Sequence, residues 1–358
     1  MTELTRRSLY LGTLGVALLA AHASPRTLAR RLGNAPVDPF ALVDPELVAA
    51  VRVIRHVAVS GRTLAAIRNA NAHGYILPAP APQPVERSIA GPAGAPLRVY
   101  VTEASSGAKG RPGVLHIHSG GFVTGTALTE APLAQTIARQ LGCVVVSVDY
   151  TLAPEMKFPG SLEQNYAALG WMHKNADALG IDPSRIGLFG ISAGGGHSAA
   201  LSIAVRDRGE YPVACLVMNY PMLDDRTGSS RPVPPHVGAF VWTRNDNVFG
   251  WTSLLGRPAG SPHAPTGAVP ARVVELAGLP PTYIGCGAID LFAGESIDYA
   301  GRLVAAGVPV GLLIVPGAYH AFDLIVPGAG VSKRFSAAWM TALERGLSSR
   351  PGAALAHG

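Results

Sequence analysis

A serine surrounded by glycines is the first candidate for chemistry in this chain. Ser192 lies in the segment GLFGISAGGG (187–196), with a glycine two positions before it and another two positions after it. This spacing is typical of a sharp strand-to-helix turn that exposes a serine hydroxyl for nucleophilic attack. A flexible loop has the same composition, and in a chain with 42 glycines the pattern alone decides little. The rest of the sequence must therefore supply the partners of the serine.

A serine hydroxyl becomes an effective nucleophile when an imidazole accepts its proton and a carboxylate orients that imidazole. Asp290 follows the apolar segment PTYIGCG (281–287), and His320 follows the next one, VGLLIVP (310–316). A serine, an acid and a histidine in this order, each after a different strand, form a known arrangement of a catalytic triad. We therefore predict that Ser192 is the nucleophile, His320 the base and Asp290 the carboxylate.

Other residues compete for these roles. Glu295 and Asp323 are alternatives to Asp290 as the acid, because a single aspartate after a strand is often only a cap or turn residue. His197 is a rival base, but it lies five residues past the serine on the same predicted helix, where its ring is poorly placed to reach the hydroxyl. The pair HIH (116–118) has a spacing that a metal site uses, yet no third ligand clusters with it, so we expect no metal.

The segment HSGGF (118–122) supplies a second requirement of acyl-transfer chemistry. Backbone N–H groups must point at the oxyanion that develops in the transition state, and glycine permits the close approach. Gly120 and Gly121 would supply two such donors, and Ala193, directly after the serine, a third. The three donors and the three triad residues occur together, which a chance loop does not explain.

The elements that must position these residues alternate along the chain from residue 97 onward. The strand-like segments are LRVYVTE (97–103), GVLHIH (113–118), CVVVSVD (143–149), RIGLFG (185–190), VACLVMN (213–219), PTYIGCG (281–287) and VGLLIVP (310–316). Helix-length segments lie near 131–141, 161–178, 193–207, 295–306 and 332–348. This alternation predicts an α/β fold with a mostly parallel central sheet flanked by helices. Ligands of such sheets bind at the carboxyl ends of the strands, where Ser192 lies.

Five segments, in order, resemble those of the bacterial hormone-sensitive-lipase-like esterases of the α/β-hydrolase superfamily, of the fold-3 type. The matching segments are HSGGF for H-G-G-G, DYTLAPE (149–155) for D-Y-R-L-A-P-E, GISAGG for G-D-S-A-G-G, AIDLFAGE for D-x-L-x-D-E, and YHAFD for H-G-F. The resemblance spans about residues 80–345. It departs from the family at five positions, namely Ser119, Thr151, Ile191, Phe292 and Gly294. None of these removes a triad residue or a donor glycine.

The resemblance implies an α/β-hydrolase fold with a helical cap and an enzyme that hydrolyses carboxylic esters with short to medium acyl chains through an acyl-enzyme. It implies the same triad, the same oxyanion donors and no cofactor. The alternatives are an amidase or peptidase that uses the same triad, or a hydrolase-fold protein that only binds a ligand. Aromatic residues near the oxyanion loop and in the cap segment are candidates for the substrate pocket, although each could equally hold the cap in place: Phe122, Tyr150, Trp242 and Trp251.

The composition limits the class of protein and its partners. The 358 residues are 48% hydrophobic and 15% charged, which excludes general disorder. The net charge of +6 comes from scattered lysines and arginines, so we expect a small-molecule ester as partner and no nucleic acid. The three cysteines lie in apolar runs and are odd in number, which predicts buried thiols: Cys143, Cys215 and Cys286. A homodimer is compatible with the sequence.

The amino terminus resembles a twin-arginine export signal. Arg6 and Arg7 precede an apolar stretch from Leu9 to Ala21, and Ala21-His22-Ala23 matches a small-residue cleavage site. We predict a signal over 1–23 and an exported protein, periplasmic or secreted, with no stable membrane span after cleavage. The alternative is a membrane anchor formed by the uncleaved signal. The remaining expected parts are an N-terminal helical cap segment and linker (24–90) and a catalytic domain (91–350) with a cap insertion near 222–275.

Overall fold

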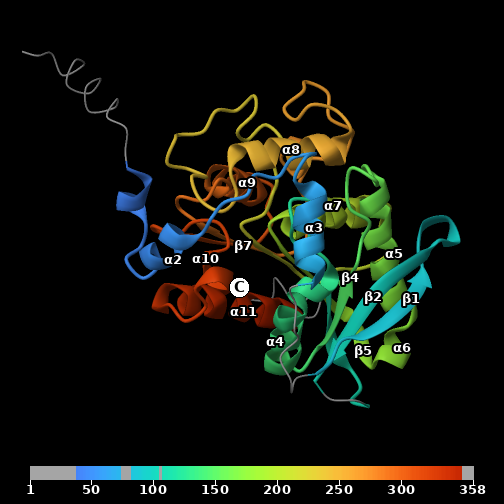
Figure 1. Ribbon diagram of the computed structural model, residues 1–358. Coiled ribbons are helices and arrows are strands. Elements are labelled where there is room, and N and C mark those ends of the chain that lie inside the picture. The colour runs from blue at the N-terminus through green and yellow to red at the C-terminus, as the bar shows by residue number, and fades with distance from the viewer. Residues whose placement is uncertain (1–37, 74–81, 105–106, 349–358) are drawn as a thin grey trace, which may run out of the picture. The chain divides into compact units, whose positions relative to one another are not determined.

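The computed structural model describes residues 38–73, 82–104 and 107–348. Within these residues one sheet contains eight strands in the order β1-β2-β4-β3-β5-β6-β7-β8 (Figure 1). The strands are β1 (Val85–Ala90), β2 (Pro96–Glu103), β3 (Arg111–Ile117), β4 (Val144–Val148), β5 (Ile181–Ile191), β6 (Leu216–Asn219), β7 (Thr282–Gly287) and β8 (Val310–Val315). The β1–β2 and β2–β4 pairs are antiparallel, and every later pair is parallel.

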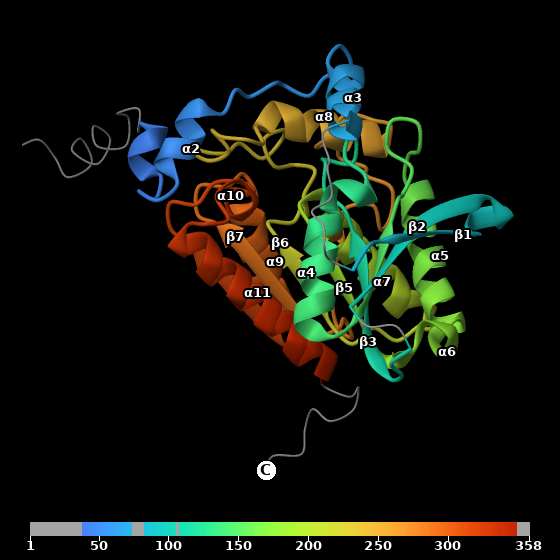
Figure 2. The same cartoon turned by 60° about the horizontal axis from the view of Figure 1, so that its bottom comes forward.

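Helices cover both faces of this sheet, and others lie beyond its edge. The α-helices of the described residues are α2 (Val48–Val53), α3 (Leu64–His73), α4 (Ala131–Leu141), α5 (Gly160–Lys174), α6 (Ala176–Leu179), α7 (Ala193–Arg208), α8 (Arg244–Leu255), α9 (Ala293–Ala305), α10 (Phe322–Ile325) and α11 (Gly330–Ser348). Alternate strand residues point to opposite faces, so Val114 packs with α4 and α11 while its neighbour Leu115 packs with α5, α7 and α9. Figure 2 shows α4 and α11 on one side of the sheet and α5 on the other.

The parallel strands bring distant parts of the sequence to one edge of the sheet. Ile191 at the end of β5 pairs with Asn219 at the end of β6, and Gly285 in β7 is the next neighbour of Asn219. The segments after β3, β5, β7 and β8 therefore begin side by side. These are the segments that carry the predicted oxyanion donors and the predicted triad.

The N-terminal segment and α8 are held together by one buried carboxylate. Asp246, in the first turn of α8, is fully buried and accepts hydrogen bonds from the backbone N–H groups of Val59 (2.7 Å) and Thr243 (2.9 Å). His56 contacts the same carboxylate through Nε2 at 2.7 Å. Asp246 thus fixes the chain that leads into α3 against the start of α8, and both views place α3 and α8 next to each other (Figures 1 and 2).

The predicted fold class is confirmed: the sheet is mostly parallel and is flanked by helices. The helix predicted over 131–141 has those limits in the structure, whereas the one predicted over 161–178 divides into α5 and α6 at Asn175. β1 and α8 were not predicted from the sequence. The predicted signal over 1–23 and part of the predicted linker lie outside the described residues. In the part of the chain that the structure describes, no helix is both long enough and apolar enough to cross a membrane.

Candidate active site

Ser192 occupies a strained turn between β5 and α7. Its backbone angles are φ 55° and ψ −118°, a conformation that residues other than glycine rarely adopt. The turn is possible because its neighbours have no side chain: a Cβ on Gly190 would lie 2.3 Å from the carbonyl oxygen of Gly194, and one on Gly194 would lie 1.9 Å from that of Ile117. The Ser192 N–H donates to the carbonyl of Asn219 at 2.9 Å. The glycines that flank the serine are therefore a steric requirement of the turn.

Ser192, His320 and Asp290 form a continuous chain of hydrogen bonds. The Nε2 atom of His320 lies 3.1 Å from the Ser192 Oγ, and its Nδ1 atom lies 2.9 Å from the Asp290 Oδ2. A carboxylate can only accept, so Nδ1 carries the proton and Nε2 is left to accept from the serine hydroxyl. All three side chains are buried, with Asp290 fully so. This is the arrangement that the order of the three residues predicts.

Neither rival acid contacts His320. The Glu295 carboxylate accepts hydrogen bonds from the backbone N–H groups of Leu223 (2.7 Å) and Asp224 and from the hydroxyl of Thr227, so it holds the chain that follows β6. Asp323 accepts from the hydroxyl of Tyr220 at 2.9 Å. Both carboxylates are buried, and burial raises the pKa of Glu295 well above its ordinary value and that of Asp323 to about 6.

The rival base, His197, packs among aromatic side chains of the core. Its ring packs edge-on against Phe122 and Tyr150, with centroids 4.9 and 4.7 Å apart. Its Nε2 atom has no hydrogen-bond partner among the described residues, and burial lowers its pKa to about 3. His197 is therefore a neutral core residue.

The predicted oxyanion donors lie in the loop after β3 and at the first residue of α7. Gly120 and Gly121 have φ of 114° and 60°, and Ala193 is the first residue of α7. Among the described residues no backbone or side-chain acceptor bonds to the N–H groups of these three residues, as expected of groups kept for a ligand. A helix N-terminus also favours negative charge, because its first N–H groups have no partner within the helix.

The carbonyl groups of the loop 118–124, the predicted oxyanion loop, explain where its N–H groups point. The Ser119 carbonyl contacts His118 Nδ1 at 2.7 Å, and the Gly120 carbonyl accepts from Thr124 N–H at 2.8 Å and Thr124 Oγ1 at 3.0 Å. In a trans peptide the C=O and N–H bonds point in opposite directions. The N–H groups of Gly120 and Gly121 must therefore point away from His118 and Thr124.

The two histidines of HIH support the oxyanion loop from behind. His116 contacts Ser147 Oγ through Nδ1 and Glu130 Oε2 through Nε2, both at 2.9 Å, and the other Glu130 oxygen accepts the backbone N–H of Ser119 at 2.8 Å. Burial opposes the charge on Glu130, but the bonds from His116 and Ser119 outweigh it and lower its pKa. Sequence reasoning missed Glu130, because nothing in its local sequence indicates a contact 11 residues away.

The second histidine of the pair packs under the same loop. The His118 ring stacks on Tyr150 with centroids 4.2 Å apart. The Tyr150 hydroxyl donates to the His118 carbonyl at 3.1 Å. In the described part of the chain, no group of three or more His, Cys, Asp or Glu side chains is arranged to hold a metal ion.

The aromatic candidates for the substrate pocket lie in two places. Trp242 lies against Gly121, with its ring centroid 6.5 Å from that of His320. Phe122 and Trp251 pack against each other with centroids 4.8 Å apart, and both are only 1% exposed. Of the four candidates, Trp242 is the side chain that lies against the predicted donor Gly121 and near His320 of the predicted triad. Phe122, Tyr150 and Trp251 pack behind the loop.

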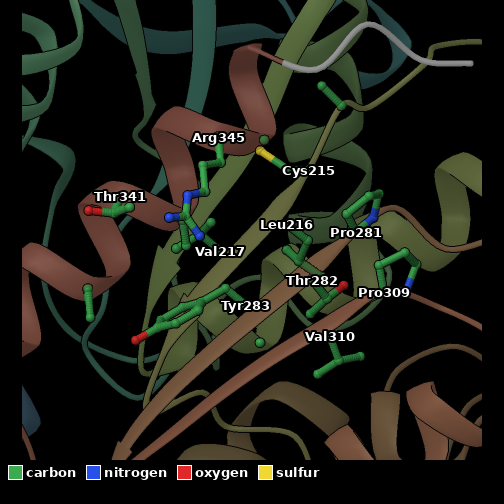
Figure 3. A pocket seen from close by; sticks show the side chains of 15 residues that line it. Cys215, Leu216, Val217, Pro281, Thr282, Tyr283, Pro309, Val310, Thr341 and Arg345 are labelled. Atoms are coloured by element: carbon green, nitrogen blue, oxygen red, sulfur yellow. The ribbon is translucent and has the colours of Figure 1, made fainter. Parts of the chain in front are cut away.

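A pocket of about 450 Å³ lies at the opposite end of the sheet. Figure 3 shows Cys215, which directly precedes β6, Tyr283 of β7 and Arg345 of α11 among the side chains around it. Leu216 of this pocket pairs with Leu188, whereas Ser192 follows the carboxyl end of β5. No triad residue lines this pocket, so its size alone does not indicate the reaction site.

Comparisons with known proteins agree with this geometry. A family described as alpha/beta hydrolase fold matches residues 114–324. The chain is 34% identical over 244 residues to a carboxylesterase, NlhH, of Mycobacterium tuberculosis, covering 66% of this chain and 74% of that protein. It is 36% identical to the solved structure of a bacterial heroin esterase, with a TM-score of 0.78 and coverage of 87% of this chain and 100% of that chain. It is 31% identical to the solved structure of esterase LipW of Mycobacterium marinum, with a TM-score of 0.74 and coverage of 87% of this chain and 98% of that chain. The chain belongs to the alpha/beta hydrolase fold family, in its hormone-sensitive-lipase-like branch.

Proposed function

We propose that this chain is a serine carboxylesterase that works through an acyl-enzyme. The Ser192 Oγ attacks the ester carbonyl while His320 Nε2 takes the hydroxyl proton, which produces a tetrahedral oxyanion. His320 then gives this proton to the departing alkoxide, so an alcohol leaves and the acyl group stays on Ser192. Water attacks the acyl-enzyme with His320 again as base, the acid is released and the serine regains its proton. Asp290 keeps the imidazole in the required tautomer and stabilises the imidazolium.

The observation that supports this proposal most strongly is the hydrogen-bond chain from Asp290 through His320 to Ser192. The relatives named above are esterases, and the matching family model spans the segments that hold the proposed triad. A protein that only bound a ligand would not need a histidine held between a serine and a carboxylate. We therefore assign chemistry, rather than binding alone, to this site.

Short to medium acyl esters are the substrates we propose. Trp242 is 9% exposed and lies over Gly121 near His320, so the space beside the serine is narrow. Each methylene that fits a pocket contributes about 0.8 kcal/mol, and each that does not fit costs packing strain. The value of kcat/KM should therefore increase with acyl-chain length and then decrease.

Export through the twin-arginine route is a further part of the proposal. It is supported by the sequence alone, by Arg6 and Arg7 before a short apolar stretch and by the cleavage pattern that ends at Ala23. These residues lie outside the described ones. The compartment should matter little to the site chemistry, because the three cysteines are free, buried thiols that require no oxidation: Cys143, Cys215 and Cys286.

One substrate panel tests the proposed reaction. Purified protein should hydrolyse p-nitrophenyl acetate and butyrate, and Ser192→Ala should remove that activity. Acyl anilides and peptides should react far more slowly, because an amide is a poorer substrate with a poorer leaving group. Equal rates on anilides and esters would indicate an amidase, and absence of turnover on every member would indicate a binding protein.

A further inference from the structure

Arg68 in α3 reaches from the N-terminal segment to the loop that follows the oxyanion donors. Its Nε donates to the carbonyl of Val123 and its Nη2 to that of Ala153, both at 2.7 Å. Its other hydrogen bonds form a bidentate pair with Glu155, at 2.8 and 2.9 Å. Hydrogen bonding by Arg68 lowers the pKa of Glu155, which keeps this carboxylate charged. One guanidinium thus connects three separate points of the catalytic domain.

The contact with Val123 continues as a relay of peptide groups toward the serine. The peptide between Val123 and Thr124 accepts from Arg68 at its carbonyl and donates through the Thr124 N–H to the Gly120 carbonyl at 2.8 Å. That carbonyl belongs to the peptide whose N–H is that of Gly121. Two trans peptides therefore lie head to tail between the guanidinium and a predicted oxyanion donor.

A second branch of hydrogen bonds runs from Arg68 through Ala153 to the same loop. The Ala153 carbonyl accepts from Arg68, and the Ala153 N–H donates to the Phe122 carbonyl at 2.9 Å. Phe122 directly follows Gly121 and has a positive φ of 69°. Both branches end within one residue of Gly121, so loss of the guanidinium would remove one anchor from each of them.

We propose that Arg68 is a positioning residue for the oxyanion hole, which it holds and polarises through the peptides of Val123 and Gly120. A positive charge at the carbonyl end of a hydrogen-bond chain strengthens the donor at the other end, and such chains are cooperative. The oxyanion exists only in the tetrahedral states, so the effect falls on the chemical step and not on binding of the neutral ester. The inference rests on the proposed ester hydrolysis and adds the N-terminal segment to the machinery of that reaction.

Arg68→Ala tests this inference, with Arg208→Ala as the matched control. Arg208 also forms a partly exposed bidentate pair with a glutamate, Glu163, and among the described residues it makes no hydrogen bond to the loop 118–124. On p-nitrophenyl butyrate, Arg68→Ala should lower kcat by about tenfold with KM changed less than about twofold. It should also weaken inhibition by a trifluoromethyl ketone, whose adduct with the serine carries an oxyanion, by a similar factor. Arg208→Ala should change none of these values.

Two further measurements separate a positioning role from a purely structural one. Added guanidinium ion should restore part of kcat in Arg68→Ala, because the Arg68 side chain is 25% exposed and a small cation can enter its site; it should not activate the wild type or the control. Arg68→Lys keeps the charge but cannot reach all the acceptors, so it should fall between wild type and alanine. The inference is overturned if Arg68→Ala or Arg68→Lys keeps wild-type kcat and inhibitor affinity, or loses activity only through KM. Because the wild type still hydrolyses the ester in either case, such a result would leave the proposed function in place.

Discussion

The indole of Trp242 lies directly against Gly121. A Cβ atom on Gly121 would lie 2.0 Å from Cη2 of this ring, and the ring centroid is 6.5 Å from that of His320. One aromatic side chain from the segment before α8 therefore borders both a predicted oxyanion donor and the proposed catalytic base, His320. Its size should control which acyl groups can reach Ser192.

The acyl-chain profile tests this control. We expect kcat/KM of the wild type to be highest for acetyl to hexanoyl esters and at least about tenfold lower for dodecanoyl esters, because added methylenes must pack against the indole. Trp242→Ala should raise the ratio of dodecanoyl to butanoyl kcat/KM by about tenfold. Trp171→Ala, in α5 away from the site, is the control. A wild-type profile that keeps rising to palmitoyl would favour a lipase with an open cap.

The identity of the acid is tested by three matched carboxylate-to-amide variants. Asp290→Asn should lower kcat by about 10³-fold or more, since an amide stabilises the wrong imidazole tautomer. Glu295→Gln and Asp323→Asn should keep kcat within about tenfold, because their carboxylates bond to backbone N–H groups and to Tyr220. If Asp290→Asn stays within tenfold while Glu295→Gln abolishes turnover, the assignment of Asp290 is wrong.

Asp323 should also make stability depend on pH. Burial raises its pKa from an ordinary value near 3.8 to about 6, so between these values the folded chain keeps a proton that the unfolded chain has lost. This group therefore lowers the free energy of unfolding as pH rises from about 4 to 6, by up to about 3 kcal/mol. Asp323→Asn still accepts a hydrogen bond from Tyr220 but does not titrate, so it should gain stability relative to the wild type between pH 4 and pH 7.

Urea unfolding of both proteins at those two pH values measures this difference. The comparison with the wild type removes the contribution of every other titrating group that the substitution leaves unchanged. A difference between variant and wild type that is the same at pH 4 and pH 7 would mean that Asp323 titrates alike in the folded and unfolded chains.

The parts of the site that follow strands could be predicted from the sequence, because a parallel sheet brings the ends of its strands together. Ser192, Asp290 and His320 each come shortly after an apolar run, and their meeting is a consequence of strand order. Supporting contacts have no such signal. Arg68 lies 55 positions from Val123 and 87 from Glu155, and nothing in its helix distinguishes it from other arginines.

Two elements were missed for opposite reasons. β1 has one buried residue among six, so its sequence lacks the alternation of apolar and polar residues that marks a half-buried strand. The start of α8 did carry a signal, since Thr243 and Asp246 form a capping box in the structure and have the spacing of that motif in the sequence.

The export prediction is tested by replacing both Arg6 and Arg7 with lysine. The twin-arginine route reads this pair of residues, so the variant should stay in the cytoplasm while the wild type is exported. Fractionation with immunodetection of the mature chain measures the outcome. Normal export of the lysine variant would favour the general secretory route, and retention of both proteins would mean that the segment is not an export signal.

Covalent labelling of the serine tests the central claim most directly. Diethyl 4-nitrophenyl phosphate, which traps activated serine nucleophiles, should transfer one diethylphosphoryl group to the peptide that contains Ser192 and abolish ester hydrolysis in parallel. His320→Ala should be labelled at least about 10³-fold more slowly, because the hydroxyl then has no base. Ser192→Ala should take up no label and lose ester hydrolysis by a similar factor. Label on another residue, or a Ser192→Ala variant that hydrolyses esters within tenfold of the wild-type rate, would contradict the account.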